Sequence, residues 1–255
     1  MNLKKIGNTQ KTDTLMITQK ICIVTCHGFT GYPEEMEPIG KFFCNKGYDW
    51  KNLQLPGHGT SPEDLKTKNW TDWTDYVLQE IDKNLKEYNN NVIMVGLSLG
   101  GALTLYTLIN RPLIKAGICL ATPINIMTFF QKMLLKIPIG MWVKNSSTKA
   151  DIFDQEMKKN HKSYSKFHSS NGKEVNYLLN YLKKNLSKIT QPILIIQSKK
   201  DQVVNYQNAQ LIYDSISSKI KEIYFVEKSS HVLTKDYDRE SIFSKSFEFA
   251  ESLGK

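Results

Sequence analysis

Residues 92–101 read Val-Ile-Met-Val-Gly-Leu-Ser-Leu-Gly-Gly, and they carry the clearest indication of the fold. The apolar, β-branched run at its start is bounded by Asn90 and Asn91 and predicts a short strand buried on both faces. Residues 102–106 predict the start of a helix. A strand, a sharp turn and a helix around Gly-x-Ser-x-Gly are the setting in which this motif presents a nucleophilic serine, here Ser98. The alternative is a serine that only caps a helix, and the rest of the chain has to decide.

Two glycines explain why the turn around Ser98 is expected to be tight. A side chain at Gly96 or Gly100 would clash with the strand or the helix, so both positions have to stay open. Ser98 between them is expected to be strained and exposed. It also lies at a helix N-terminus, where unpaired N–H groups and the helix dipole favour developing negative charge.

The composition indicates one α/β domain with room for a small insertion. The chain has 255 residues, of which 40% are hydrophobic and 23% charged, as is typical of a globular protein. The formal charge of +9 raises the question of an anionic partner. Because the lysines are scattered without a basic block, we expect weak attraction to anionic surfaces at most, and no nucleic-acid binding.

The cysteines and histidines show no metal-binding pattern. The four cysteines have neither a Cys-x-x-Cys pair nor zinc-type spacing, so we expect no metal and no cofactor. Residues 1–14 lack the apolar core of a signal peptide, and no apolar run approaches the roughly 18–20 residues that span a bilayer. A cytoplasmic monomer or homodimer is therefore the expectation.

Apolar strands and amphipathic helices alternate along most of the chain. Strands are predicted at 14–18 (weakly), 21–26, 48–55, from 92 onward, and at 116–121, 192–197 and 222–226. Helices are predicted at 34–46, 70–88, from 102 to about 111, at 206–216 and over the last residues. This order implies an α/β fold with a mostly parallel central sheet and helices on both faces.

The alternation stops between residues 122 and 189. An apolar stretch interrupted by Pro138, a polar run to Lys173 and an amphipathic helix follow one another there. We interpret 122–189 as a small cap inserted into a core formed by 1–121 and 190–255. The alternative is a set of ordinary helices packed on that core.

Three residues follow predicted strands in an order that indicates nucleophilic catalysis. Acyl transfer by a serine needs a base to take its proton and a carboxylate to orient that base. Ser98, Asp201 and His231 each come after a strand, at the sheet edge where ligands bind. The order Ser, Asp, His is that of α/β-hydrolases. Asp154 and Asp236 are poorer candidates for the acid, since one lies in the insertion and the other beyond the histidine.

Four further histidines compete with His231 for the role of the base. His27 and His58 lie on glycine-rich loops, where we expect a structural or pocket-lining role. His161 and His168 fall in the polar part of the insertion and are expected to be solvated. His231 stays the preferred base.

A tetrahedral intermediate also needs donors for its oxyanion. The main-chain N–H of Leu99, which follows the nucleophile, is one candidate. The loop at 27–31, His-Gly-Phe-Thr-Gly, follows an early strand and offers the N–H of Phe29 as the second.

Taken together, the motifs resemble those of the α/β-hydrolase superfamily, and most of all the small bacterial carboxylesterases and monoacylglycerol lipases. The matching residues are 27–31, 56–59 (Pro-Gly-His-Gly), 96–101, Asp201 before Val203, and 230–232. The resemblance implies an eight-stranded, mostly parallel sheet and a small cap. It also implies the triad named above, with the Phe29 and Leu99 amides as oxyanion donors.

The resulting expectation is a serine carboxylesterase that forms an acyl-enzyme on Ser98. Its substrate would be a small apolar ester with a short- to medium-chain acyl group, with monoacylglycerols among the candidates. One alternative is a thioesterase or an acyltransferase that uses the same triad. Another is a small-ligand binding or sensor protein of this fold with little turnover.

Overall fold

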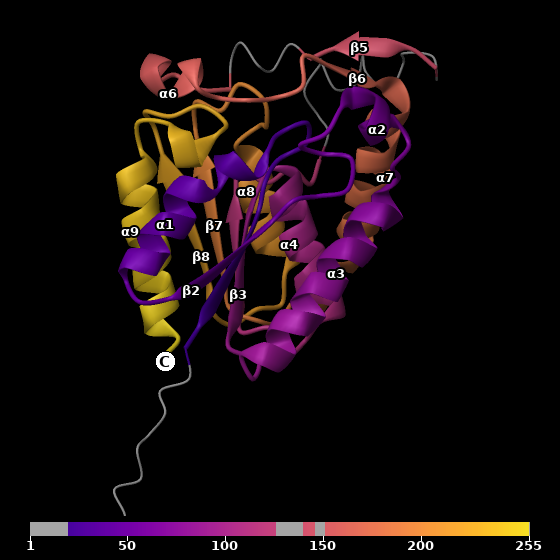
Figure 1. The fold of residues 1–255 in the computed structure, drawn as a ribbon. Coiled ribbons are helices and arrows are strands. Elements are labelled where there is room, and N and C mark those ends of the chain that lie inside the picture. The colour runs from indigo at the N-terminus through magenta and orange to yellow at the C-terminus, as the bar shows by residue number, and fades with distance from the viewer. Residues whose placement is uncertain (1–19, 126–139, 146–150, 255) are drawn as a thin grey trace, which may run out of the picture.

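A six-stranded sheet, parallel throughout, forms the centre of the computed structural model, which describes residues 20–125, 140–145 and 151–254 (Figure 1). The strands lie in the order β2-β1-β3-β4-β7-β8, so the chain starts near the middle and moves outward in both directions. The strands of this sheet are β1 Cys22–Cys26, β2 Asp49–Leu53, β3 Val92–Leu97, β4 Ala116–Leu120, β7 Ile193–Ser198 and β8 Lys221–Val226.

Helices cover both faces of the sheet. One face carries α1 and α9, and the other carries α3, α4, α7 and α8 (Figure 1). The helices are α1 Glu37–Asn45, α2 Pro62–Lys66, α3 Trp70–Glu87, α4 Leu99–Asn110, α6 Gln155–Lys159, α7 Ser169–Asn185, α8 Gln207–Ser215 and α9 Arg239–Ser252. Short 3-10 turns are η1 Pro33–Glu35, η3 Leu186–Lys188 and η4 Leu233–Lys235.

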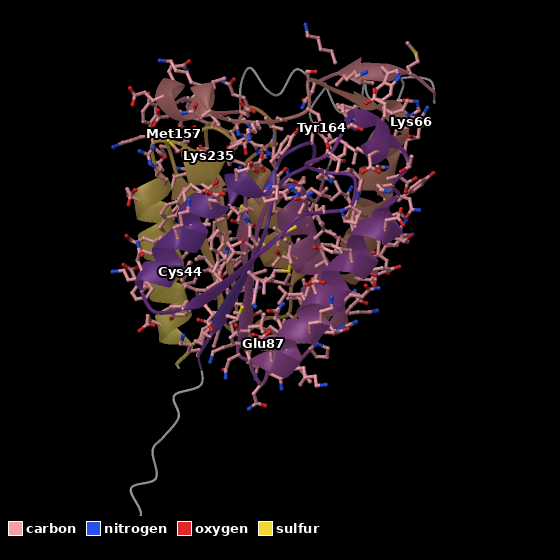
Figure 2. The ribbon with its side chains drawn as sticks, in the orientation of Figure 1. Cys44, Lys66, Glu87, Met157, Tyr164 and Lys235 are labelled. Carbon is pink, nitrogen blue, oxygen red and sulfur yellow. The ribbon has the colours of Figure 1, made fainter. Side chains whose placement is uncertain are left out.

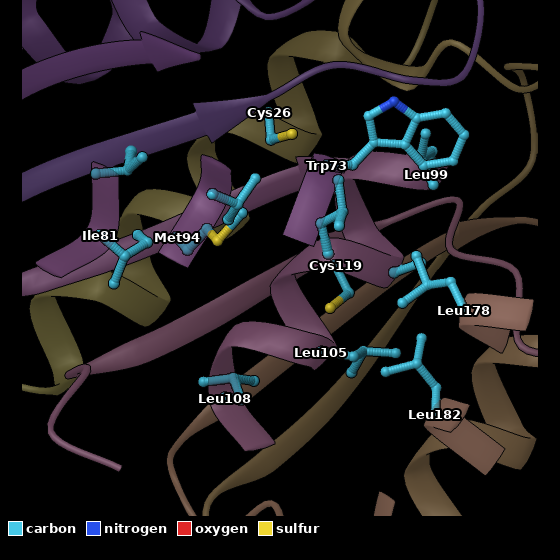
Figure 3. Close-up of a cluster of buried hydrophobic side chains, with 14 of the residues drawn as sticks. Cys26, Trp73, Ile81, Met94, Leu99, Leu105, Leu108, Cys119, Leu178 and Leu182 are labelled. Atoms are coloured by element: carbon cyan, nitrogen blue, oxygen red, sulfur yellow. The ribbon is translucent and has the colours of Figure 1, made fainter. Parts of the chain in front are cut away.

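Each face of the sheet has its own hydrophobic core. Along β3, Val92 and Met94 belong to the cluster under α3 and α4, whereas Ile93 and Val95 belong to the cluster under α1 and α9. This follows from the two-residue period of a strand, and it explains why β3 is apolar at every position. Figure 3 shows the first cluster, in which Trp73 lies beside Leu99 at the start of α4.

The predicted order of strands and helices is confirmed, with shifts at the ends of elements. The predicted helix at 34–46 begins as the turn η1 and continues as α1. Between the predicted strand at 48–55 and the predicted helix at 70–88, where the sequence predicts neither helix nor strand, the chain forms α2. The described residues hold six strands in the main sheet, two fewer than the eight that the resemblance implies. The weak strand expected at 14–18 lies outside the described residues.

Between β4 and β7 the chain forms a second, two-stranded antiparallel sheet of β5 Trp142–Lys144 and β6 Lys166–His168. This sheet and α6 lie at the upper edge in Figure 1. By contrast, α7 packs its leucines Leu178 and Leu182 into the core beside α4 (Figure 3). Most of the apolar stretch around Pro138 lies outside the described residues. The division of the chain at 122–189 therefore stays a prediction.

Candidate active site

The turn between β3 and α4 is as tight as its glycines predict. A Cβ on Gly96 would lie 2.0 Å from the carbonyl oxygen of Gly100, and one on Gly100 would lie 2.1 Å from that of Cys26 in β1. Ser98 has φ 55° and ψ −111°, a left-handed conformation that L-residues rarely adopt. Its N–H donates to the carbonyl oxygen of Leu120 at 2.8 Å, which ties the turn to the neighbouring strand.

Asp201 and His231, predicted as acid and base, meet beyond the ends of β7 and β8. His231 Nδ1 lies 2.9 Å from Asp201 Oδ2, and both side chains are buried. An ionised carboxylate only accepts, so the imidazole donates from Nδ1 and keeps the lone pair of Nε2 for a proton. This is the tautomer that a general base requires.

The carboxylate of Asp201 is held in place by main-chain and side-chain donors. Its Oδ1 accepts from the N–H groups of Val203 and Val204, both at 2.8 Å. Its Oδ2 accepts from Gln197 Nε2 at 2.9 Å as well as from His231. These four donors hold the carboxylate of Asp201 in one orientation, and Asp201 in turn orients the ring of His231.

The surroundings of His231 favour its protonated form. Burial, the largest single influence, disfavours the charge, but the charge and hydrogen bond of Asp201 and the charges of nearby carboxylates together outweigh it, so the pKa of His231 lies above its ordinary value. The carboxylates of Asp151 and Glu35 act in the same direction. The main chain of His231 is anchored too, because its N–H and that of Val232 both donate to the carbonyl oxygen of Asp151 at 2.9 Å.

Ser98 follows β3 at the same sheet edge at which Asp201 and His231 follow β7 and β8. Among the described residues, Ser98 Oγ makes no hydrogen bond to the imidazole, so the direct contact present is the one between Asp201 and His231. Bonds between a nucleophile and its base are often long in ligand-free sites and shorten when substrate binds.

The loop after β1 presents the Phe29 amide beside the serine. The carbonyl oxygen of Gly28 accepts from His27 Nδ1 at 2.9 Å and from the N–H of Gly31 at 3.2 Å. In a planar trans peptide the N–H of Phe29 points the opposite way, so these two bonds also aim that N–H. A Cβ on Gly28 would lie 3.5 Å from Ser98 Cβ, which puts this loop next to the nucleophile.

The N–H of Leu99 belongs to the first turn of α4, where a helix has no internal acceptor. Within the described residues, neither this N–H nor that of Phe29 donates to another residue. Among the described residues these two N–H groups are therefore unpaired, and both belong to segments that adjoin Ser98.

His27 and His58 are structural, as expected. His27 is fully buried, and Leu55 donates its N–H to the Nε2 at 3.1 Å. One ring nitrogen donates and the other accepts, so both bonds need the neutral ring, and burial lowers the pKa of His27 to about 4. Burial also lowers the pKa of His58, whose ring lies 5.0 Å from that of His27.

The expectation that His161 and His168 are solvated is wrong. The side chain of His161 is only 5% exposed, and its Nε2 lies 3.7 Å from Glu35 Oε1 and 3.5 Å from Asp151 Oδ2. His168 is buried at the start of α7, where Ser170 bonds to its Nδ1. Both lie in segments of polar sequence, which gives no sign that the fold covers them.

Neither competing carboxylate contacts His231. Asp154 caps α6 and pairs with Arg239. Asp236 is fully buried and accepts four main-chain N–H groups, those of residues 153, 154, 230 and 237. It therefore ties the segment before α6 to the loop that carries His231. No sequence pattern predicts this role, because main-chain donors do not depend on residue type.

Aromatic rings surround Phe29. Its ring centroid lies 5.3 Å from that of Phe167 in β6 and 6.2 Å from those of Trp73 and His58. Edge contacts of this kind stabilise a pair by about 0.5–1.5 kcal/mol beyond the area they bury. The loop at 27–31, whose Phe29 amide is the proposed oxyanion donor, is called the donor loop below. It is fixed by packing as well as by hydrogen bonds. Of the apolar rings beside it, Trp73 precedes the proposed insertion at 122–189 and Phe167 lies within it.

Cys22, Cys26 and Cys119 are buried and behave as small hydrophobic residues, whereas Cys44 is exposed. Burial raises the pKa of the Cys22 and Cys119 thiols to about 12, so neither is a nucleophile at neutral pH. No cluster of side chains suited to a metal ion occurs in the part of the chain that the structure describes. In the same residues, no helix has both the length and the apolar character needed to cross a bilayer.

Comparisons with known proteins agree with this geometry. The family described as serine aminopeptidase, S33, matches residues 18–238. A thermostable monoacylglycerol lipase from Bacillus sp. (strain H-257) is 33% identical over 229 residues, 89% of each chain. A carboxylesterase from Bacillus subtilis (strain 168) is 25% identical and covers 91% of this chain and 92% of its own.

Solved structures show the same fold. A structure reported for LipS and LipT, two metagenome-derived lipolytic enzymes, superposes with a TM-score of 0.84 at 29% identity, over 92% of this chain and 94% of that one. The monoacylglycerol lipase of Paleococcus ferrophilus has a TM-score of 0.77 at 18% identity, over 91% and 95%. The chain therefore belongs to the serine aminopeptidase S33 family of α/β-hydrolases and is an ester-hydrolysing enzyme, as the sequence predicts.

Proposed function

We propose that this enzyme hydrolyses carboxylic esters with short- to medium-chain acyl groups through an acyl-enzyme on Ser98. The observation that carries the proposal is the bond between Asp201 and His231, which leaves His231 Nε2 free to take a proton. It lies at the sheet edge at which Ser98 stands in a strained turn, next to the N–H groups of Phe29 and Leu99, which donate to no other residue in the part of the chain that the structure describes.

Each residue has one role in this reaction. His231 Nε2 takes the proton of Ser98 Oγ while the oxygen attacks the ester carbonyl. The N–H groups of Phe29 and Leu99 stabilise the negative charge on the carbonyl oxygen. The protonated His231, stabilised by Asp201, then donates its proton to the leaving alcohol. Water activated by the same imidazole releases the acid and restores Ser98.

An apolar substrate fits the side chains around the donor loop. The rings of Phe167 and Trp73 lie against Phe29, so an ester bound to the Phe29 amide would have apolar neighbours. We propose that residues 122–189 act as the cap that contributes this side of the site, with Phe167 as one of its members. The 33% identical monoacylglycerol lipase makes monoacylglycerols the first natural esters to test.

A series of p-nitrophenyl esters from acetyl to palmitoyl tests the proposal, with Ser98→Ala as the control. We expect kcat/KM to peak at a short or medium acyl chain and to fall by several orders of magnitude in the variant. A peak at palmitoyl would contradict the proposed chain length. Activity that survives Ser98→Ala would contradict the nucleophile.

Two outcomes would point to the alternative functions. Turnover of acyl thioesters but not of oxygen esters would indicate a thioesterase. A tightly retained ligand together with negligible turnover of every ester would indicate a binding or sensor protein.

A further inference from the structure

A buried group of two carboxylates and one imidazole lies beside the site and has no role in the triad. It consists of Glu35, Asp151 and His161, whose side chains are only 5–6% exposed. Burying charged groups is costly unless they are paired, and replacing them by apolar residues is often neutral or stabilising. Stability alone therefore does not explain such a cluster beside the histidine of the triad, and we ask what else it does.

Glu35 lies directly against the loop that carries the Phe29 amide. Its Oε2 accepts the N–H of Gly28 at 2.9 Å. A Cβ on Gly31 would lie 2.2 Å from Glu35 Oε1, so the loop fits around this carboxylate only because Gly31 has no side chain. Glu35 thus holds the N–H side of Gly28, while His27 holds its carbonyl.

Asp151 is the counterpart of Glu35 on the side of the base. Its main-chain carbonyl accepts the N–H groups of His231 and Val232. Its side chain and that of Glu35 both face His161 Nε2, at 3.5 Å and 3.7 Å. Among the described residues, His161 Nδ1 and Asp151 Oδ1 have no hydrogen-bond partner, and Lys158 Nζ lies 3.8 Å from Asp151 Oδ1, so the contacts of the cluster are mainly electrostatic.

The cluster consequently connects three segments that are far apart in the sequence: the donor loop, the segment from Asp151 to His161, and the loop of His231. We propose that Glu35 is a positioning residue. Together with Asp151 and His161, it fixes the donor loop relative to His231 and keeps negative charge close to His231. This inference rests on the proposed function, because it concerns the orientation of the same donors and base.

The charges around Glu35 come from several elements. Burial raises the pKa of its carboxyl, whereas His161, the N–H of Gly28, Lys235 and His231 act in the opposite direction. Lys235 belongs to η4, and Figure 2 shows it at the upper end of the molecule, the end that carries α6.

The carboxylates whose charges act on His231 are Asp201, Asp151 and Glu35, and all three raise its pKa. Removing the charge of Glu35 or Asp151 should therefore move the acid limb of the kcat/KM profile to lower pH. A residue that only stabilised the fold would leave this limb where it is.

The test compares Glu35→Gln, Glu35→Asp, Asp151→Asn and Glu34→Gln. Glu35→Gln keeps the shape but not the charge, so we expect kcat to fall about tenfold with little change in KM, since the donors act mainly on the transition state. We also expect its acid limb to move to lower pH. Glu35→Asp keeps the charge but loses reach to Gly28, so its kcat should fall while the limb stays in place.

Asp151→Asn removes the second charge and should also move the limb to lower pH. It tests the effect of charge on its own if the Glu35 variants do not fold. The neighbouring Glu34, which forms an exposed pair with Lys162, is the matched control. Glu34→Gln should behave as the wild type.

Labelling of the wild type with a fluorophosphonate separates the two claims. If Ser98 is labelled and the wild type is active, but Glu35→Gln matches Glu34→Gln in kcat and in pH profile, the positioning role is wrong and the proposed function stands. If Ser98 is not labelled, both are wrong.

Discussion

Acid should destabilise this enzyme through His27, a residue that does not take part in the reaction. The ring donates from Nδ1 to the carbonyl oxygen of Gly28 and accepts at Nε2 from the N–H of Leu55. A second proton would have to go on Nε2, against the N–H that points at it. Protonation of the folded state is therefore opposed by a lost hydrogen bond as well as by burial.

The size of the effect follows from the two pKa values. The pKa of His27 is about 4 in the fold and 6.5 when it is unperturbed. A depressed pKa gives stabilisation that is present above pH 6.5 and is lost as the pH falls towards 4. Complete loss amounts to about 3 kcal/mol, of which about 2 kcal/mol disappears between pH 7 and pH 5.

Urea unfolding of the wild type and of His27→Gln at these two pH values measures the effect. Glutamine does not titrate, so the wild type should lose about 2 kcal/mol more than the variant on going from pH 7 to pH 5. The comparison removes the contributions of His231 and Glu35, which are common to both proteins. If the free energy of unfolding of the wild type and of His27→Gln changed equally between pH 7 and pH 5, His27 would not be the cause. If the variant does not fold, an NMR titration of His27 in the wild type replaces the urea experiment. A His27 ring that is already charged at pH 5 would then contradict the predicted loss of stability.

Other variants test the site and its scaffold. Asp201→Asn should lower kcat on the order of 10⁴-fold through the wrong tautomer, whereas Asp236→Asn should mainly lower the free energy of unfolding, by about 1–3 kcal/mol. The reverse ranking in ester turnover would move the role of the acid to Asp236. Because the pKa of His231 is raised, the acid limb of kcat/KM should have its midpoint above 6.5, and a midpoint at or below this value would contradict the assigned surroundings. Gly100→Ala should cost about 3 kcal/mol in thermal or urea unfolding, since its Cβ meets the main chain of β1. Gly172→Ala in α7, where the nearest atom is 3.8 Å away, should be neutral or slightly stabilising, and equal losses in the two variants would refute the packing argument.

The sequence predicts the fold well where the physics is local. The apolar run of β3 and the glycines around Ser98 define a strand, a turn and a helix by themselves. In the structure, a Cβ on Gly96 or on Gly100 would collide with main-chain atoms. The contact between Asp201 and His231 was predictable because parallel strands end at one edge of the sheet, so residues that follow neighbouring strands come together.

Other features depend on contacts that the sequence does not encode locally. Glu35 and His161 are far apart in the chain, and His161 is flanked by polar residues, so its burial follows from packing alone. The strands β5 and β6 have three residues each, too short for an alternating pattern to be detected. Asp236 acts through main-chain donors, which every residue type except proline supplies.

Intact mass after treatment with a fluorophosphonate, followed by peptide mapping, tests the central claim most directly. We expect one adduct per chain, on Ser98, with loss of ester turnover in proportion to labelling and no adduct in Ser98→Ala. An adduct on another residue, or none on an active enzyme, would contradict the assignment of Ser98 as the nucleophile.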